Sequence, residues 1–208
     1  FVGVNCGIMD QFAVGMGKEN HAIHLNTNTL EYKLVPLDTG KYTLVIANTN
    51  KKRALADSKY NERRSQSDLG LEILQNNGVK AKELCDITVD EFEAVKYHLT
   101  DPIIKNRVEH GVYENHRVSE AVDSLTNGNI LRFGELMNQS HDSCRDLYEV
   151  SCRELDVLVD AFKKNKAIGA RMTGAGFGGC AIALVPTEDL EESLKNVKDI
   201  YVKEVGYN

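Results

Sequence analysis

The sequence has 208 residues, of which 42% are hydrophobic and 27% charged, as expected of a globular domain with a sizeable core. The net charge of −6, from 31 acidic and 25 basic side chains, argues against nucleic acid as a partner, because nucleic-acid-binding domains usually present a basic face. No stretch approaches the roughly 20 apolar residues that span a bilayer, so no membrane partner is expected.

The cysteines and the two chain ends give further expectations. The five cysteines are widely spaced and form no CxxC pair, which predicts neither a disulfide framework nor a zinc site. A reducing cytoplasm is therefore the expected location. The chain starts without methionine, and its last predicted helix should lead into another strand, so we expect both ends to be cut.

The first part of the chain predicts one short helix and three strands. Asn5 is the expected N-cap of a helix over residues 8–14, which the following glycines would end. Two strands over residues 21–25 and 30–35 flank a turn-rich stretch of Asn and Thr. The third strand, over residues 42–47, alternates little in hydropathy, so we expect it to be buried on both faces.

Helical periodicity dominates the middle and the end of the chain. The predicted helices cover residues 55–75, a short segment capped by Thr88, residues 108–125, 130–148 and 155–162, and a final helix capped by Thr187. A short apolar strand over residues 181–185 precedes the final helix. Because the strands gather early and the helices come in runs, the predicted fold class is α+β rather than alternating α/β.

Five glycines crowd residues 169–179. Gly174, Gly176 and Gly179 satisfy the GxGxxG pattern by letter, but that dinucleotide fingerprint needs a strand before it and a helix after it. Here a helix is predicted before the run and a strand after it, so the dinucleotide site is rejected. A tight turn without a ligand needs only one or two glycines, and five favour backbone that lies close to a bound group.

Asp10 is a carboxylate inside an otherwise apolar helical segment. Burying an ionised carboxylate costs several kcal/mol, so Asp10 is expected to be paired, protonated or facing a cleft. A structural salt bridge and a catalytic role are both compatible with this position.

Two further groups of polar residues stay ambiguous from the residues alone. Tyr60 lies in a charged helix start that follows a strand, where either a ligand contact or a solvated surface fits. Arg107, His110 and Glu114 share a predicted helix with apolar residues. A lone His in such a helix is more often a satisfied core residue than a base or a metal ligand.

Three segments together resemble the galactokinase family, within the GHMP superfamily of small-molecule kinases. They are residues 6–12 (CGIMDQF), residues 48–64 with the run YNERR from Tyr60, and residues 171–180 (RMTGAGFGGC). The resemblance implies a two-lobed GHMP-kinase fold and an ATP-dependent transfer of phosphate to the C1 hydroxyl of galactose. It implies that Asp10 is the catalytic carboxylate, acting as base or orienter, and that Gly7 and Tyr60 contact the sugar along with Asp10.

The resemblance also implies a role for the glycine-rich run, as a motif that packs beside the phosphate-binding loop. Its residues are Gly174, Ala175, Gly176, Gly178 and Gly179. The family's loop that cradles the ATP phosphates, and the glutamate that holds Mg²⁺, would lie before this chain, so no metal ligand is expected here.

The missing motifs imply that these residues are a fragment, roughly the C-terminal half, which is inactive alone and needs the N-terminal half of the same protein. Residues 1–40 would then end the first lobe, and residues 41–208 would form most of the second. Two alternatives stay open: a sibling kinase that acts on N-acetylgalactosamine, and a galactose-sensing regulator that binds without catalysis. The residues that would distinguish them lie largely upstream.

Overall fold

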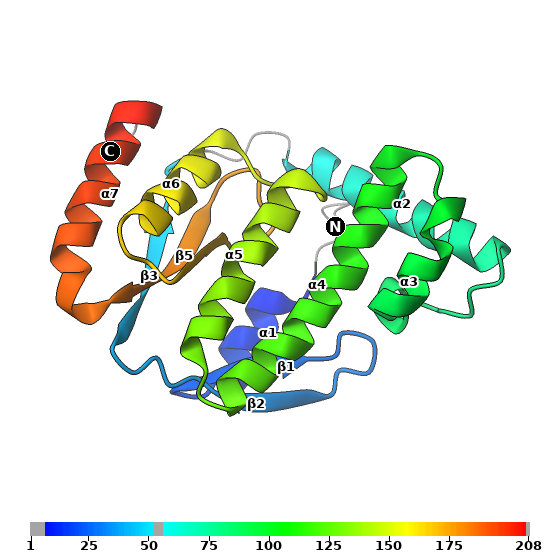
Figure 1. The fold of residues 1–208 in the computed structure, drawn as a ribbon, viewed down its shortest axis with the longest axis horizontal. Helices are drawn as coiled ribbons and strands as arrows, with labels where there is room; N and C mark the ends of the chain where they lie inside the picture. Colours follow the sequence, from blue (N-terminus) through cyan, green and yellow to red (C-terminus); the bar gives the residue numbers. More distant parts are fainter. Residues whose placement is uncertain (1–6, 52–55, 207–208) are drawn as a thin grey trace.

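The computed structural model describes residues 7–51 and 56–206 and contains both helices and antiparallel sheets, which confirms the predicted α+β class (Figure 1). The α-helices are α1 (Met9–Met16), α2 (Ala56–Asn76), α3 (Val89–Val95), α4 (Pro102–Thr126), α5 (Ile130–Asp146), α6 (Arg153–Lys164) and α7 (Leu190–Val205). The strands are β1 (His21–Leu25), β2 (Tyr32–Pro36), β3 (Tyr42–Asn48), β4 (Gly169–Met172) and β5 (Cys180–Pro186). Short 3₁₀ turns cover Leu84–Asp86, Lys96–His98 and Thr187–Asp189.

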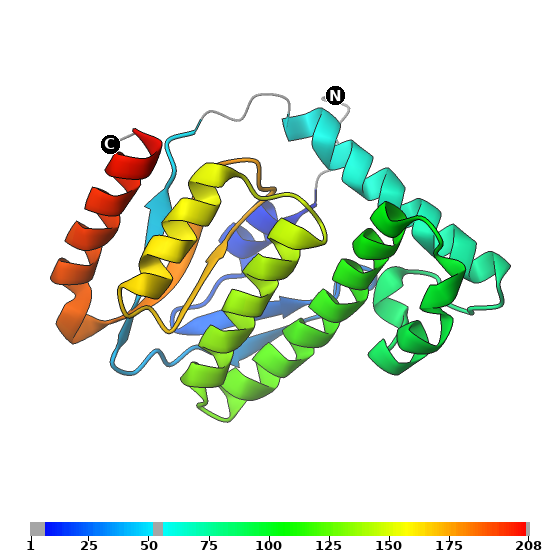
Figure 2. The same ribbon diagram turned by 45° about the horizontal axis from the view of Figure 1, so that its top comes forward.

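The strands form two separate antiparallel sheets. β1 and β2 make a hairpin, and the second sheet has the order β3-β5-β4. Leu184 of β5 stands between Leu44 of β3 and Gly169 of β4 in this register. Figures 1 and 2 show α4 and α5 running side by side across the middle, with α2 and α3 at one end and α7 at the other.

The largest apolar cluster lies between the second sheet and the helices α6 and α7. Leu155 and Phe162 of α6 and Val197 of α7 pack there against Ala181 and Ala183 of β5. A second cluster joins α2, α3 and α4 around Leu74, Phe92 and Val108. The apolar periodicity predicted for α6 and α7 is therefore the side of each helix that faces this core.

Caps at the helix starts explain where several helices begin. The Thr88–Glu91 capping box at the start of α3 is confirmed, with the Thr88 side chain accepting from the Glu91 amide. α4 begins earlier than predicted, because the Asp101 carboxylate accepts the Ile103 N–H at 2.7 Å and Pro102 occupies the first turn. The predicted Thr187 cap is wrong: α7 starts at Leu190, and the Thr187 hydroxyl lies 2.9 Å from that of Thr43. The predicted cap Asn5 lies outside the described residues.

Two strand predictions need correction. β3 is an edge strand with one uncovered face, where Leu44 and Ile46 are 43% and 70% exposed, so burial on both faces is wrong. A four-residue strand, β4, separates α6 from the glycine run, where a continuous hinge was expected. The GxGxxG letters therefore follow a strand after all, but β5 and not a helix comes next, so the dinucleotide site is still rejected.

The described helices include none that is long and apolar enough to cross a membrane.

Candidate active site

Asp10 is the second residue of α1 and is exposed. Every residue of this short helix lies at the surface of the described structure or is only half-buried, so Asp10 carries no burial cost there. No ion pair involves Asp10 within residues 7–51 and 56–206, so the structural salt bridge considered for it is not found there. A carboxylate in the first turn of a helix is compatible with the helix dipole, and this one is free to meet a ligand.

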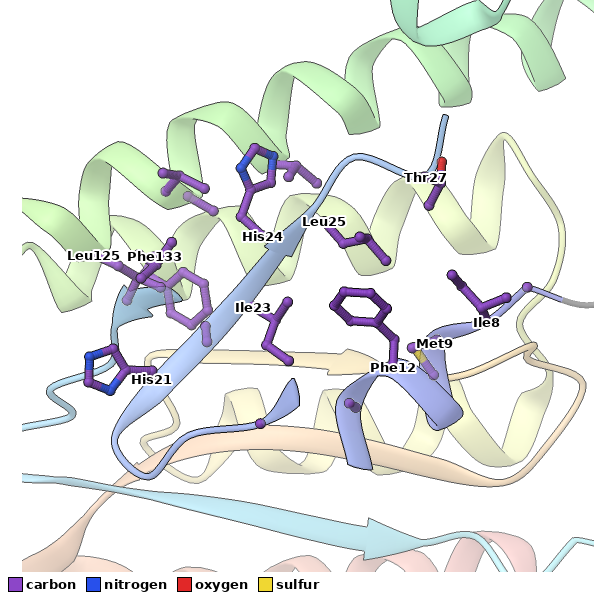
Figure 3. A pocket seen from close by; sticks show the side chains of 18 of the residues that line it. Ile8, Met9, Phe12, His21, Ile23, His24, Leu25, Thr27, Leu125 and Phe133 are labelled. Atoms are coloured by element: carbon purple, nitrogen blue, oxygen red, sulfur yellow. The ribbon is translucent and has the colours of Figure 1, made fainter. Parts of the chain in front are cut away.

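Gly7 precedes α1 and lines a cavity of about 700 Å³ between α1, β1 and the helices α4 and α5. An added Cβ at Gly7 would meet nothing within 4 Å, so packing in the described structure does not require glycine there. Figure 3 shows Phe12 of α1, and Ile8 just before this helix, in the same cavity as Ile23 and Leu25 of β1. Its lining is mostly apolar and does not include Asp10, which is unlike a site for a polar sugar.

The glycine-rich run forms a tight loop between β4 and β5. Gly174, Gly176, Gly178 and Gly179 have φ between +77° and +132°, and Phe177, at +59°, is also in the left-handed region. An ideal Cβ on Gly176 would lie 2.1 Å from the Val150 carbonyl oxygen, so side chains are excluded there by close backbone packing as well as by φ.

Neighbouring segments hold this loop through backbone hydrogen bonds. The Phe177 N–H donates to the Val150 carbonyl at 2.7 Å, and the Thr49 N–H and hydroxyl both donate to the Gly179 carbonyl at 2.8 Å. Lys51, at the end of β3, forms a 2.7 Å ion pair with Glu154 at the start of α6. The loop is thus packed between the segment after β3 and the segment before α6.

His141 supports the strand that leads into the loop. Its side chain is fully buried in α5, and its Nδ1 accepts the Met172 N–H at 3.2 Å. This bond requires the ring proton to be on Nε2, which lies 3.4 Å from an Asp156 oxygen without hydrogen-bond geometry. His141 therefore orients the end of β4 relative to α5.

Tyr60 is half-buried in the first part of α2. Its neighbour Lys59 places its ammonium 5.6 Å from the centre of the Phe177 ring, so this part of α2 contacts the glycine-rich loop. The basic pair Arg63 and Arg64 is balanced within the same helix, by Glu62 at 3.0 Å and Asp68 at 2.9 Å.

His110, which the sequence left unassigned, is a core residue. It is buried in α4, its Nδ1 lies 2.9 Å from the Ser143 hydroxyl, and its ring stacks on Tyr148 with centroids 4.5 Å apart. Burial lowers the pKa of His110 to about 4, so the ring is neutral at pH 7.

Glu114 is held in an ionised state although it is largely buried. Burial alone would raise its pKa, but Arg171, Ser140 and Arg117 outweigh this and leave the pKa below its ordinary value. Its carboxylate lies 2.8 Å from Arg117 Nε and 3.6 Å from Arg171 Nη1. Arg171 also lines the apolar cavity, so this charge cluster links α4 to β4 beside α1.

The structure brings some of the predicted site residues together and not others. The helix that carries Tyr60 touches the glycine-rich loop, and Gly7 shares its cavity with Arg171, which leads into that loop. Within the described residues, no side-chain hydrogen bond or ion pair joins Asp10 to Tyr60 or to the glycine-rich loop. No group of three His, Cys, Asp or Glu side chains that could hold a metal ion occurs in the part of the chain that the structure describes.

Residues 121–202 match the family described as GHMP kinases C terminal. The chain is similar to the galactokinase of Clostridium tetani, with 52% identity over 100% of this chain and 53% of that protein. The crystal structure of Lactococcus lactis galactokinase complexed with galactose has a TM-score of 0.93 and 46% identity, over 99% of this chain and 53% of that one.

L. major mevalonate kinase in complex with R-mevalonate shares the fold, with a TM-score of 0.54 and 23% identity over 86% of this chain and 44% of that one. The family resemblance and the GHMP-kinase fold expected from the motifs are thus confirmed. The chain spans about half the length of the galactokinases that it matches.

Proposed function

We propose that this chain is the C-terminal part of a galactokinase, which transfers the terminal phosphate of ATP to the C1 hydroxyl of galactose and releases galactose 1-phosphate. The observation that carries the proposal is the similarity along the whole chain to galactokinases, including one whose structure was solved with galactose. The finer assignments below also rest on the geometry of α1, α2 and the glycine-rich loop.

Asp10 is the proposed catalytic carboxylate. It would orient the C1 hydroxyl and accept its proton as the new bond to phosphorus forms. Its exposure and its lack of an ion pair within the described residues support this role, because nothing there competes for the carboxylate. Since phosphoryl transfer passes through a loose transition state, positioning and electrostatics contribute more than base strength. Gly7 and Tyr60 are proposed to contact the sugar beside it.

The glycine-rich loop is proposed to lie next to the ATP phosphates. Its residues are Gly174, Ala175, Gly176, Gly178 and Gly179. The four glycines have a left-handed backbone, and the absence of their side chains lets backbone amides approach a bound group closely. Mg²⁺ bound with the nucleotide would neutralise charge on the phosphates. Because the described residues include no cluster suited to a metal, its ligands are assigned to the N-terminal half and no step through the ion is assigned to this chain.

The N-terminal half of the same protein is the proposed partner of this chain. Residues 1–40 would complete the first lobe, with residues 41–208 forming the second. The support is the state of α1: an eight-residue helix without a buried side chain is only marginally stable by itself, and it borders an open apolar cavity. We also propose a reducing cytoplasm as the location, in keeping with the free thiols of the four cysteines that the structure describes.

The test is Asp10→Asn in the full-length protein, meaning this chain preceded by its N-terminal half. The amide keeps the shape and can still bind the hydroxyl, but it cannot accept a proton. We expect the rate of galactose-dependent ADP release to fall by about 10²- to 10⁴-fold if Asp10 is the base. Thermal stability should change little, because the side chain is exposed.

The matched control is Asp90→Asn, which removes another exposed carboxylate from the first turn of a helix, α3. It should leave turnover unchanged. Full turnover in Asp10→Asn would contradict the proposed role. A wild-type protein that phosphorylates N-acetylgalactosamine in preference to galactose would indicate the sibling kinase, and one that binds galactose without releasing ADP would indicate the sensor.

A further inference from the structure

Arg107 of α4 is 1% exposed and is the largest fully buried side chain among the described residues. Its guanidinium reaches two segments that are far apart in sequence. Nε donates to the Gln66 side-chain oxygen of α2 at 2.9 Å, Nη2 donates to a Glu149 carboxylate oxygen at 2.6 Å, and Nη1 donates to the Leu147 carbonyl. One side chain thus joins α2 to the turn between α5 and α6.

Glu149 shows that this turn is held under strain. Its φ is +53°, in the left-handed region that residues other than glycine rarely adopt because it strains the backbone. The same carboxylate oxygen that accepts from Arg107 also lies 3.4 Å from Arg63 Nη2 on α2. Although half of the Glu149 side chain is exposed, its charge is directed inward to two arginines rather than to solvent.

The turn sets the position of the glycine-rich loop. Val150 follows Glu149 directly, and its carbonyl is the group that accepts the Phe177 N–H and that leaves no space for a Cβ on Gly176. On the other side, Gln66 and Arg63 lie one to two turns after Tyr60 in α2. Any shift of Glu149 relative to α4 would therefore move the loop relative to the helix that carries Tyr60.

We propose that Arg107 is a positioning residue that, through Glu149 and Gln66, holds Tyr60 and the glycine-rich loop in one fixed arrangement. The inference rests on the proposed function for its catalytic consequence, and on the contacts above for its structural part. Buried ion pairs often contribute little net stability relative to apolar packing, so a positioning role accounts for this network better than stability does.

The test is Glu149→Gln in the full-length protein, which keeps the side-chain shape and removes the charge that both arginines share. Hydrogen exchange followed by mass spectrometry should show faster exchange in two segments, the one with the Phe177 amide and residues 60–66. We expect at least about a tenfold increase there, and a fall in kcat/KM for galactose of about tenfold. The control is Asp68→Asn, which breaks the exposed Arg64–Asp68 pair on the same helix and should change neither.

Glu149→Gly is the second variant, because glycine adopts the positive φ without strain and favours folding while it still removes the carboxylate. It should reproduce the faster exchange. Exchange unchanged from wild type in both variants, or raised uniformly over the whole chain, would overturn the inference. If the wild-type protein shows no turnover, the proposed function fails, whereas the exchange experiment still decides whether Arg107 and Glu149 position these segments.

Discussion

Gly176 shows how one residue without a side chain permits the close packing of two segments. The Val150 carbonyl occupies the space that a Cβ would need, and the Phe177 N–H beside it donates to that carbonyl. Left-handed φ at Gly176 adds a second requirement for glycine. The steric constraint comes from a contact between residues 150 and 176, which are 26 positions apart in the sequence.

We predict that Gly176→Ala destabilises the full-length protein by about 2–4 kcal/mol, the sum of left-handed strain and a steric overlap that backbone must relieve. Gly128→Ala is the control, because Gly128 has φ +68° but open space around it. This variant should lower the free energy of unfolding by only about 1 kcal/mol. Urea denaturation of both variants measures the difference. Equal losses would show that the Val150 contact is easily displaced.

The packing of α5 on β4 depends on a pair of glycines. A Cβ on Gly134 would lie 2.7 Å from the Ile168 carbonyl oxygen, and one on Gly169 would lie 2.4 Å from the Gly134 carbonyl oxygen. The helix and the strand therefore meet backbone to backbone, with the Asn138 side chain accepting the Ala170 N–H at 3.0 Å. The same contact brings the His141 ring next to the Met172 N–H, and this hydrogen bond positions the end of β4, from which the glycine-rich loop starts.

Gly134→Ala should destabilise the full-length protein by about 1–2 kcal/mol, because overpacking at the α5–β4 contact exceeds the gain in helix propensity. Gly111→Ala in α4 is the matched control. The added Cβ would lie 3.1 Å from the flexible end of the Leu84 side chain. The stability of this variant should therefore equal that of the wild type or exceed it by up to about 1 kcal/mol. Thermal and urea unfolding test the pair, and a stabilised Gly134→Ala would contradict the backbone-contact explanation.

At the scale of the whole molecule, the elements α1 and β3 keep apolar side chains exposed. α1 lacks a buried residue, the outer face of β3 exposes Leu44 and Ile46, and Met9 and Val14 are exposed on α1. Met9 lines the apolar cavity of Figure 3, and Leu44 and Ile46 lie on β3, the edge strand of the second sheet. The proposed N-terminal half would cover part of this surface and bring the missing phosphate and metal groups to Asp10.

We therefore predict that residues 1–208 alone release no ADP above background with galactose and ATP in a coupled assay, whereas the full-length protein does. Hydrogen exchange should also be fast throughout α1 in the 208-residue chain and slow in the full-length protein, because covering the helix protects its amides. Turnover by the 208-residue chain would refute the proposed division of the site between two halves.

Local patterns in the sequence were enough for the periodic helices, the capping box at Thr88 and the α+β class, because these features depend on residues within a few positions of one another. The motifs around Asp10, Tyr60 and Gly176 were enough to identify the kinase family. β4 was missed, since four residues containing Gly169 and Arg171 show no alternation and become a strand only by pairing with β5.

The burial or exposure of particular residues depends on contacts between segments that are far apart in the sequence. Arg107 could not be distinguished from a surface arginine before Gln66, Leu147 and Glu149 were seen around it. The exposure of Asp10 and of the outer face of β3 likewise follows from which elements pack over them, and hydrophobicity alone predicts burial without naming the partner that covers a face. Chemistry could be read from short motifs, whereas burial and positioning were set by residues that approach one another only after folding.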